Sequence, residues 1–139
     1  MKQLGYQINL LSKLMKQELT RLLIKYELTP AQYAVLKQLE IHPQQPAVKL
    51  ASQLYFDKPT MSGIVNRLTE KQLIMCNPHP SDKRIKLLAL TVTGQQLISE
   101  IEELNEQVVK KAIRHLDTEA VDVFEQLLGR MISNFEEGS

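Results

Sequence analysis

Residues Pro46–Gly94 read PAVKLASQLYFDKPTMSGIVNRLTEKQLIMCNPHPSDKRIKLLALTVTG. In the first part, apolar residues recur every three or four positions, which is typical of amphipathic helices, and a short turn separates two such runs. The second part holds two apolar runs around a turn-forming segment rich in cations, which predicts a hairpin. The stretch therefore predicts a helix-turn-helix followed by a wing.

The two helices are expected over residues 48–55 and 58–72, with Phe56 and Asp57 in the turn. Leu50, Ala51 and Leu54 form the inner face of the first helix. Asp57 is a favourable N-cap for the second, because the first amide protons of a helix have no acceptor within it. A proline in that first turn is compatible with this start.

The second helix has one apolar face and one small, polar face. At about 100° per residue, the apolar face consists of Met61, Ile64, Val65 and Leu68. The opposite face consists of Pro59, Ser62, Gly63, Asn66 and Glu70, with Thr60 and Arg67 on one flank. Such a face can enter a DNA major groove, and an ordinary amphipathic surface helix remains the alternative.

The hairpin is expected to have a strand over 73–76, a turn over 77–82 and a return strand over 84–90. Lys83, Arg84 and Lys86 lie at or beside the tip, where cations can reach the minor groove or the adjacent phosphates. His79, in the same turn, is expected to be a polar residue near a phosphate. The wing is thus a second candidate surface for DNA.

Two amphipathic helices are expected before this unit. Residues 6–26 carry an apolar stripe wide enough for a core helix or a subunit interface. The segment Thr29-Pro30-Ala31-Gln32 has the capping-box pattern and predicts the start of the next helix. That helix is expected to end by His42, because Pro43 disfavours helical geometry in the residue before it.

Two long helices are expected after the wing. Thr91 and Thr93 compete as N-caps of the first, which is predicted to run to about His115. Asp117 and Thr118 mark a break and the start of the second. The last helix is so apolar on one side that we expect a dimer to cover it.

The composition is that of one globular domain. Of the 139 residues, 43% are hydrophobic and 24% charged, and no apolar run is long enough to span a bilayer. The N-terminus lacks a signal-peptide pattern, so a cytoplasmic location is expected by default. The single cysteine, Cys76, excludes an internal disulfide and a zinc site built from several cysteines.

The net charge of +1 conceals a segregation of charge along the chain. Residues 49–94 carry seven Lys or Arg against three acids, whereas residues 95–139 carry four against ten. The near-neutral total therefore does not argue against a nucleic-acid partner. Solvated surface charge is the alternative explanation.

Two motifs at the wing resemble those of a known family. Asp82-Lys83-Arg84, followed by Leu90-Thr91-x-x-Gly94, is similar to the D-x-R and L-T-x-x-G motifs of the MarR family of bacterial transcriptional regulators, at matching spacing. Residues 57–68 resemble its recognition helix, and Leu50-Ala51 resembles its first helix-turn-helix segment. The order of expected elements is similar over almost the whole chain.

This resemblance implies a mainly α fold with a small β wing. It implies one winged helix-turn-helix domain over 1–139, with the helix-turn-helix at about 47–71, the wing at about 73–92, and dimerisation helices at about 1–27 and 93–137. The implied function is a sequence-specific regulator of double-stranded DNA, a homodimer on a pseudo-palindromic operator. The implied mode of action is a repressor that responds to a small-molecule effector.

The resemblance also assigns roles to residues. The segment from Lys58 to Arg67 would face the major groove, Asp82 would brace the wing, Arg84 would reach the minor groove or the backbone, and Thr91 would cap the next helix. Together with the tip residues, the candidate DNA contacts are Lys58, Pro59, Thr60, Ser62, Gly63, Asn66, Arg67, His79, Ser81, Asp82, Lys83, Arg84 and Lys86. An effector pocket would lie where the dimer helices meet the winged lobe, near Tyr6, Tyr26 and Tyr33, for which core packing is the alternative.

Three positions depart from the family pattern. Gln72 stands where members often have Gly at the end of the recognition helix, Gly63 stands where an Arg is common, and Cys76-Asn77 stand where an Arg often begins the wing. The geometry of the helix end is therefore in question. Base preference cannot be transferred from relatives.

Other functions have weaker support. His42, His79 and His115 are far apart and form no i, i+4 pair, so no metal is expected. Cys76 could act as a redox sensor, although a partly buried structural residue fits its place better. Phosphate-binding loops and catalytic motifs are absent, so neither an enzyme nor a cofactor is expected. A winged-helix protein-interaction module is the other alternative, because cations are few around Cys76 and the C-terminal helices are acidic.

Overall fold

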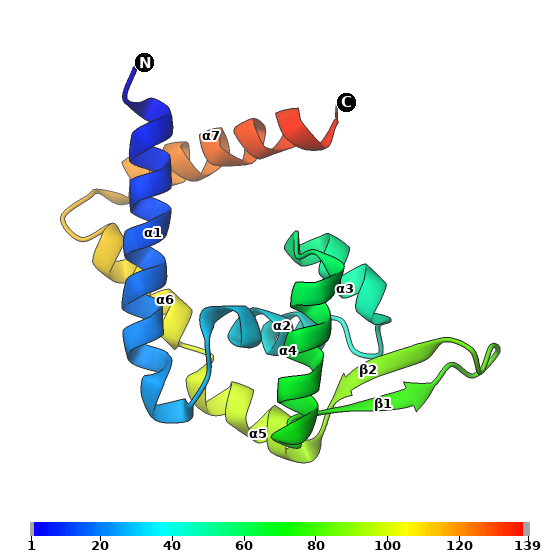
Figure 1. Ribbon diagram of the computed structural model, residues 1–139. Helices are drawn as coiled ribbons and strands as arrows, with labels where there is room; N and C mark the ends of the chain where they lie inside the picture. Colours follow the sequence, from blue (N-terminus) through cyan, green and yellow to red (C-terminus); the bar gives the residue numbers. More distant parts are fainter. Residues whose placement is uncertain (1, 138–139) are drawn as a thin grey trace.

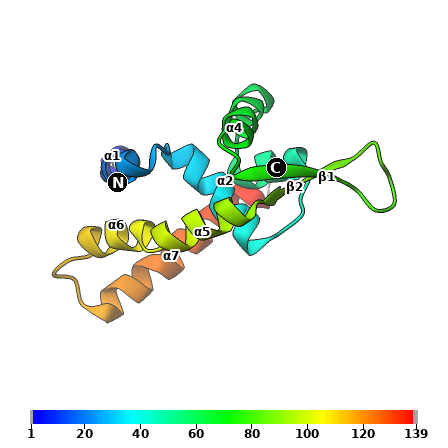
Figure 2. The ribbon, with the colours of Figure 1, turned by 90° about the horizontal axis from the view of Figure 1, so that it is seen from below.

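The computed structural model has the expected mainly α architecture with one two-stranded antiparallel sheet, and it describes residues 2–137. Met1, Gly138 and Ser139 belong to the predicted domain but lie outside the described residues. The elements are α1 (Leu4–Leu23), the 3-10 turn η1 (Ile24–Tyr26), α2 (Pro30–Ile41), α3 (Ala47–Leu54), α4 (Lys58–Glu70), β1 (Ile74–Pro78), β2 (Lys86–Leu90), α5 (Val92–Ile101), α6 (Leu104–Ala112) and α7 (Thr118–Glu136). Figures 1 and 2 show the β1–β2 hairpin projecting away from the helices.

Local signals in the sequence predicted the starts of α2, α4 and α7 correctly. The amide of Gln32 donates to Thr29 Oγ1, and the amide of Thr29 donates to Gln32 Oε1, both at 3.1 Å, which is the predicted capping box. Asp57 and Asp117 each accept from the amide three residues later, at 2.8 and 2.7 Å. These caps involve partners only three residues apart, so the chain needs no tertiary contact to form them.

The hydrophobic core joins the end of α1 to the helix-turn-helix, the wing and helices α5 and α6. Its members include eight side chains that are almost completely buried: Leu23, Val35, Leu36, Leu39, Leu50, Leu68, Ile98 and Ile101. Burying one such side chain stabilises the fold by about 1.5–3 kcal/mol. The core therefore fixes α4 and the base of the hairpin on one rigid support.

The helix predicted from the wing to about His115 is interrupted, which corrects the sequence reading. Helix α5 ends at Ile101 and α6 begins at Leu104. The buried Tyr33 hydroxyl donates to the carbonyl oxygens of Ile101 and Glu102, at 3.5 Å each. A side-chain donor at these carbonyls competes with the helical amides, so the regular ladder stops there.

The hairpin also differs from the prediction in its length. Asn77 and Pro78, predicted in the turn, continue β1 and pair with Leu87 and Lys86. Pro78 is tolerated because it is the last residue of the strand and need not donate to the ladder. Arg84, predicted in the return strand, instead lies in the turn before β2.

A third segment pairs with the hairpin near its base. The amide of Leu88 donates to the Gln45 carbonyl at 2.7 Å, and the amide of Gln45 donates to the Leu88 carbonyl at 3.1 Å. Gln45 lies in the loop between α2 and α3, so this bridge connects the hairpin to the helix-turn-helix entrance.

Helix α7 contributes no buried residue, although its sequence is strongly amphipathic. Val123, Phe124, Leu127, Ile132 and Phe135 are all about half exposed or more. The first half of α1 is similarly exposed, and only Leu19 and Leu23 of this helix are buried. Within residues 2–137, no helix combines the length and apolarity that crossing a membrane would require.

Candidate nucleic-acid interface

Helix α4 presents its small, polar face to solvent because its other face is embedded in the core. Met61, Ile64 and Leu68 are buried, at 2, 8 and 0% exposure. The predicted contacts on this helix are all exposed: Lys58, Pro59, Thr60, Ser62, Gly63, Asn66 and Arg67. The hydrogen bond from the Thr60 amide lowers the pKa of the capping carboxyl of Asp57. The cap thus holds a negative charge at the N-terminus of the helix, where the helix dipole favours it.

A shallow groove of about 480 Å³ separates α3 from α4. Its walls include apolar side chains such as Val48, Phe56 and Val65, and Lys58, Ser62 and Asn66 also line it. Three of the predicted contacts therefore lie around one hollow on the exposed side of the helix-turn-helix.

The wing tip is organised by one carboxylate. Asp82 Oδ1 accepts from the backbone amide of Arg84 at 3.0 Å and from Arg84 Nε at 3.1 Å, and Asp82 Oδ2 accepts from Arg84 Nη2 at 3.1 Å. These bonds hold the pKa of Asp82 below its usual value and raise that of Arg84. The Arg84 side chain nevertheless stays 91% exposed, so the pair orients the guanidinium without burying it.

His79 has a structural role at the tip that sequence reasoning missed. Its Nδ1 accepts hydrogen bonds from the backbone amides of Ser81 and Asp82, at 3.0 and 3.3 Å. This arrangement requires an unprotonated Nδ1, so Nε2 remains as the donor that could face a phosphate. A histidine within a polar turn, two residues before Ser81, is the only signal in the sequence, and it is too weak to predict these bonds.

The recognition helix and the wing are joined by a side chain that the sequence reading treated only as a cap. Thr91 Oγ1 accepts from the Gly94 amide at 3.0 Å and donates to the Gln72 carbonyl at 2.7 Å. It is the N-cap of α5, whereas the competing Thr93 lies inside that helix. Thr91 therefore links the segment after α4 to the exit of the wing.

Backbone geometry reinforces this junction. Gln72 has a φ of 61°, the left-handed conformation that glycine adopts most easily. A Cβ atom on Gly94 would lie only 2.1 Å from the carbonyl oxygen of Leu73, so this close approach requires glycine. The departure at Gln72 thus keeps the geometry expected of a glycine at the helix end and replaces only the residue.

Cys76 is exposed, which corrects the expectation of partial burial. The side chain lies on β1 beyond the buried end of the strand, where Met75 is also exposed. Within residues 2–137, no group of three or more His, Cys, Asp or Glu side chains is arranged to hold a metal ion.

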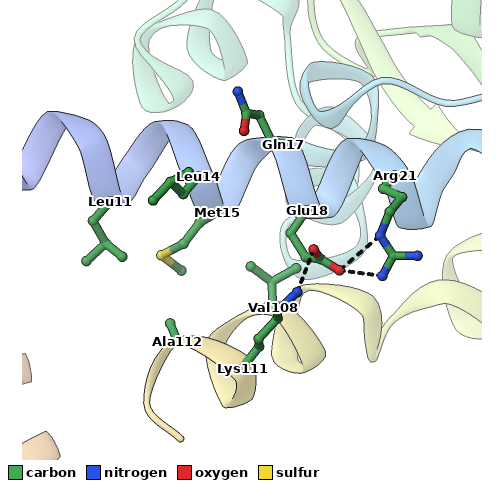
Figure 3. A pocket seen from close by; sticks show the side chains of 9 residues that line it. All are labelled: Leu11, Leu14, Met15, Gln17, Glu18, Arg21, Val108, Lys111 and Ala112. Atoms are coloured by element: carbon green, nitrogen blue, oxygen red, sulfur yellow. Dashed lines mark hydrogen bonds and ion pairs between the residues drawn. The ribbon is translucent and has the colours of Figure 1, made fainter.

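A second hollow, of about 500 Å³, lies between α1 and α6 and is shown in Figure 3. Leu11, Leu14, Met15, Val108 and Ala112 form its apolar walls. At one end, Glu18 binds two cations: it accepts from Arg21 and, at 3.0 Å, from Lys111 Nζ. The bond with Arg21, followed by that with Lys111, lowers the pKa of Glu18.

This hollow is not lined by the tyrosines expected near an effector pocket. Tyr33 is buried in the core, at 4% exposure, Tyr26 packs against the core, and Tyr6 is 68% exposed. Core packing, the alternative in the sequence reading, accounts for Tyr33 and Tyr26.

Comparisons with known proteins agree with this geometry. A family model described as "MarR family" matches residues 28–86, which include the whole helix-turn-helix, β1 and the wing tip. Among curated proteins, the chain is similar to the transcriptional regulator HosA of Escherichia coli O111:H-, with 25% identity over 107 residues that cover 77% of this chain and 79% of that protein. The HTH-type transcriptional regulator MhqR of Bacillus subtilis (strain 168) is 24% identical over 107 residues, covering 77 and 74%.

Solved structures extend the similarity to nearly the full chain. A mutant of MarR from E. coli in complex with operator DNA superposes with a TM-score of 0.84 at 25% identity, covering 92% of each chain. The S. aureus MepR–DNA complex gives a TM-score of 0.86 at 25% identity, covering 94% of this chain and 97% of the other. The wing motifs, the fold and these matches point the same way: the chain is similar to regulators of the MarR family, most clearly over residues 28–86.

Proposed function

We propose that this protein is a transcriptional regulator that binds double-stranded DNA as a homodimer and represses until a small ligand releases it. The observation that carries the proposal is the junction at Thr91, which locks an exposed, groove-compatible helix and a cationic wing tip into one rigid unit. Two related structures of this fold hold DNA, which supports the same use of the unit here.

In this proposal α4 lies in the major groove, and the wing follows the neighbouring phosphates or minor groove. The short side chains of Ser62 and Asn66 can reach base edges, and Asn can bond adenine bidentately. Arg84, oriented by Asp82, supplies a cation that does not depend on sequence. Lys83 and Lys86 add charge beside it.

The dimer is proposed to form through the terminal helices. Within residues 2–137 nothing covers the apolar side of α7, and the first half of α1 is exposed as well. Charge favours a match between them: α1 and α6 together carry five Lys or Arg against two acids, whereas α7 carries one against four. A second copy can therefore place its acidic α7 against α1 and α6 and bury the apolar stripes of both.

The effector is proposed to act through the hollow between α1 and α6. Its apolar walls and the cations Arg21 and Lys111 suit a small apolar molecule with an acidic group, which would compete with Glu18 for them (Figure 3). The hollow lies between the proposed dimer helices. A ligand bound there can therefore change the distance between the DNA-binding units of the two chains, each made of the helix-turn-helix and the wing.

Selection of bound sites from a random duplex pool tests this function. We expect a pseudo-palindrome with half-sites about one helical turn apart, and binding that weakens steeply with salt. Arg84→Ala should weaken specific and non-specific binding alike. Wild-type protein that enriches no sequence and shifts no duplex at low salt would contradict the proposal.

Experiments on the same purified protein distinguish two alternative functions from the proposed one. A protein-interaction module would bind a stoichiometric protein partner that DNA does not displace. A thiol sensor would lose DNA binding on treatment with peroxide, and Cys76→Ser would abolish that response; the exposure of Cys76 makes this measurement informative.

A further inference from the structure

We infer that Gly63 is the point where the recognition helix comes closest to the bases, and that its missing side chain selects the base pair read there. This inference rests on the proposed function and assigns a specificity determinant within it. The base feature that it would accept is the 5-methyl group of thymine.

Gly63 is unfavourable for the fold as it stands. It is the sixth of the thirteen residues of α4, where glycine destabilises a helix because it loses more backbone freedom on folding than alanine does. An alanine at this position would therefore favour the helix.

The fold offers no compensating reason for this glycine. No glycine within the described residues has a positive φ, so the backbone at Gly63 suits any residue. A Cβ atom there would meet nothing within 4 Å, whereas one on Gly94 would overlap the Leu73 carbonyl. Gly94 is therefore required by the fold, and Gly63 is not.

The surroundings of Gly63 form a low point on the exposed face. Its neighbours on that face, Pro59, Ser62 and Asn66, are short, while the longer Arg67 lies one turn later on the flank. The buried Met61 and Ile64 hold the helix in position beneath them. A base edge can thus approach the helix backbone at Gly63 more closely than at any position with a side chain.

The chemistry of this low point favours a thymine methyl group. The backbone amide and carbonyl of a helix interior are already bonded within the helix, so Gly63 offers a small apolar surface with no free donor or acceptor. In the major groove, the thymine methyl is the apolar feature that such a surface can contact. A Cβ would occupy the same space.

The test compares wild type, Gly63→Ala and Gly129→Ala, each as the full chain. Gly129 is also helix-interior with nothing within 4 Å of a Cβ, and it lies beside the polar Gln126 and Ser133 of α7. We expect both substitutions to raise the melting temperature by about 2–5 °C. Only Gly63→Ala should weaken binding to the selected duplex, by about tenfold or more, with little change for non-specific DNA.

Base substitution locates the contact. Replacing thymine by uracil at one position of each half-site should weaken wild-type binding and should have little further effect on Gly63→Ala, because the two changes remove the same contact. A random-pool selection with Gly63→Ala should lose preference at that base pair and keep the others.

Two results would overturn the inference. One is a Gly63→Ala protein that is more stable and binds the selected duplex as tightly as wild type. The other is an equal loss on selected and non-specific duplexes, which would indicate altered docking rather than base selection. Wild-type protein without sequence preference would instead refute the proposed function, so the two failures are distinguishable.

Discussion

The hydroxyl of Tyr55 donates a 3.0 Å hydrogen bond to a carboxylate oxygen of Glu136, 81 positions later in the sequence. Tyr55 caps the C-terminus of α3 in the left-handed conformation, with a φ of 59°, and Glu136 is the last residue of α7. This bond therefore connects the turn of the helix-turn-helix to the end of the proposed dimerisation helix.

The first prediction concerns the titration of this pair. The hydrogen bond to Glu136 raises the pKa of Tyr55, so its stabilising effect is complete below the ordinary tyrosine pKa of about 10 and is lost as the pH rises through the folded-state value. Glu136→Gln should lower the pKa of Tyr55, as measured by ultraviolet absorbance of phenolate, with Tyr55→Phe assigning the signal. Glu137→Gln is the matched control, and an unchanged midpoint in Glu136→Gln would show that the bond is absent in solution.

The second prediction concerns Thr91. Thr91→Val should lower the free energy of unfolding by about 1–2 kcal/mol, because it removes an N-cap and leaves the Gln72 carbonyl without its donor. Thr91→Ser should retain most of the stability, since the hydroxyl is kept. Thr93→Ala is the control: it should be neutral or slightly stabilising in urea unfolding, and an equal loss from it would indicate that Thr93 is the cap.

The third prediction concerns the left-handed residue after α4. Gln72→Gly should stabilise the protein by up to about 1 kcal/mol, because glycine adopts a φ of 61° without steric cost. Glu70→Gly, two residues earlier within the helix, should have the opposite sign. Denaturant unfolding of both variants measures the difference, and destabilisation by Gln72→Gly would exclude this conformation.

The fourth prediction separates orientation from charge at the wing tip. Asp82→Asn removes a negative charge beside a polyanion, so charge alone predicts tighter DNA binding. The bidentate pair with Arg84 predicts weaker binding instead, because the guanidinium and the turn lose their brace. Titration of a labelled duplex at two salt concentrations decides the sign, and Arg84→Ala should reduce the salt slope by about one.

The fifth prediction concerns the dimer. Phe124→Glu places a charge on the exposed apolar side of α7 and should shift the protein to monomers in sedimentation measurements. The helical signal should persist, because α7 supplies no residue to the core. Glu125→Gln, its sequence neighbour, should stay dimeric. Wild-type protein that is monomeric at micromolar concentration would contradict the proposed assembly.

The features that could be predicted from the sequence are the local ones. The caps at Thr29 and Asp57 and the helix start at Asp117-Thr118 were predicted correctly, because donor and acceptor of each cap are three residues apart. The buried face of α4 follows from helical periodicity and was also correct. The resemblance to the MarR family was found in the wing motifs for the same reason, since their residues are close together in the chain.

The features that could not be predicted depend on partners distant in sequence. The interruption between α5 and α6 lies beside the hydroxyl of Tyr33, a residue 68 positions before Ile101 in the sequence. No local sequence pattern predicts it. The exposure of Cys76 depends on where the core ends beneath β1. The DNA contacts themselves remain predictions. The fold explains why these side chains are exposed, whereas their base preference depends on the duplex that they meet.

The hydrophobic core ends at Val108, well before α7 begins at Thr118. The core therefore needs no residue of α7, and each chain can fold its helix-turn-helix and wing before it meets a partner. The last step in making a working molecule is then an encounter between two chains, whose rate depends on their concentration. Cells that produce little of this protein would accumulate folded monomers. The protein concentration itself would then set how soon two chains assemble into a dimer that binds DNA.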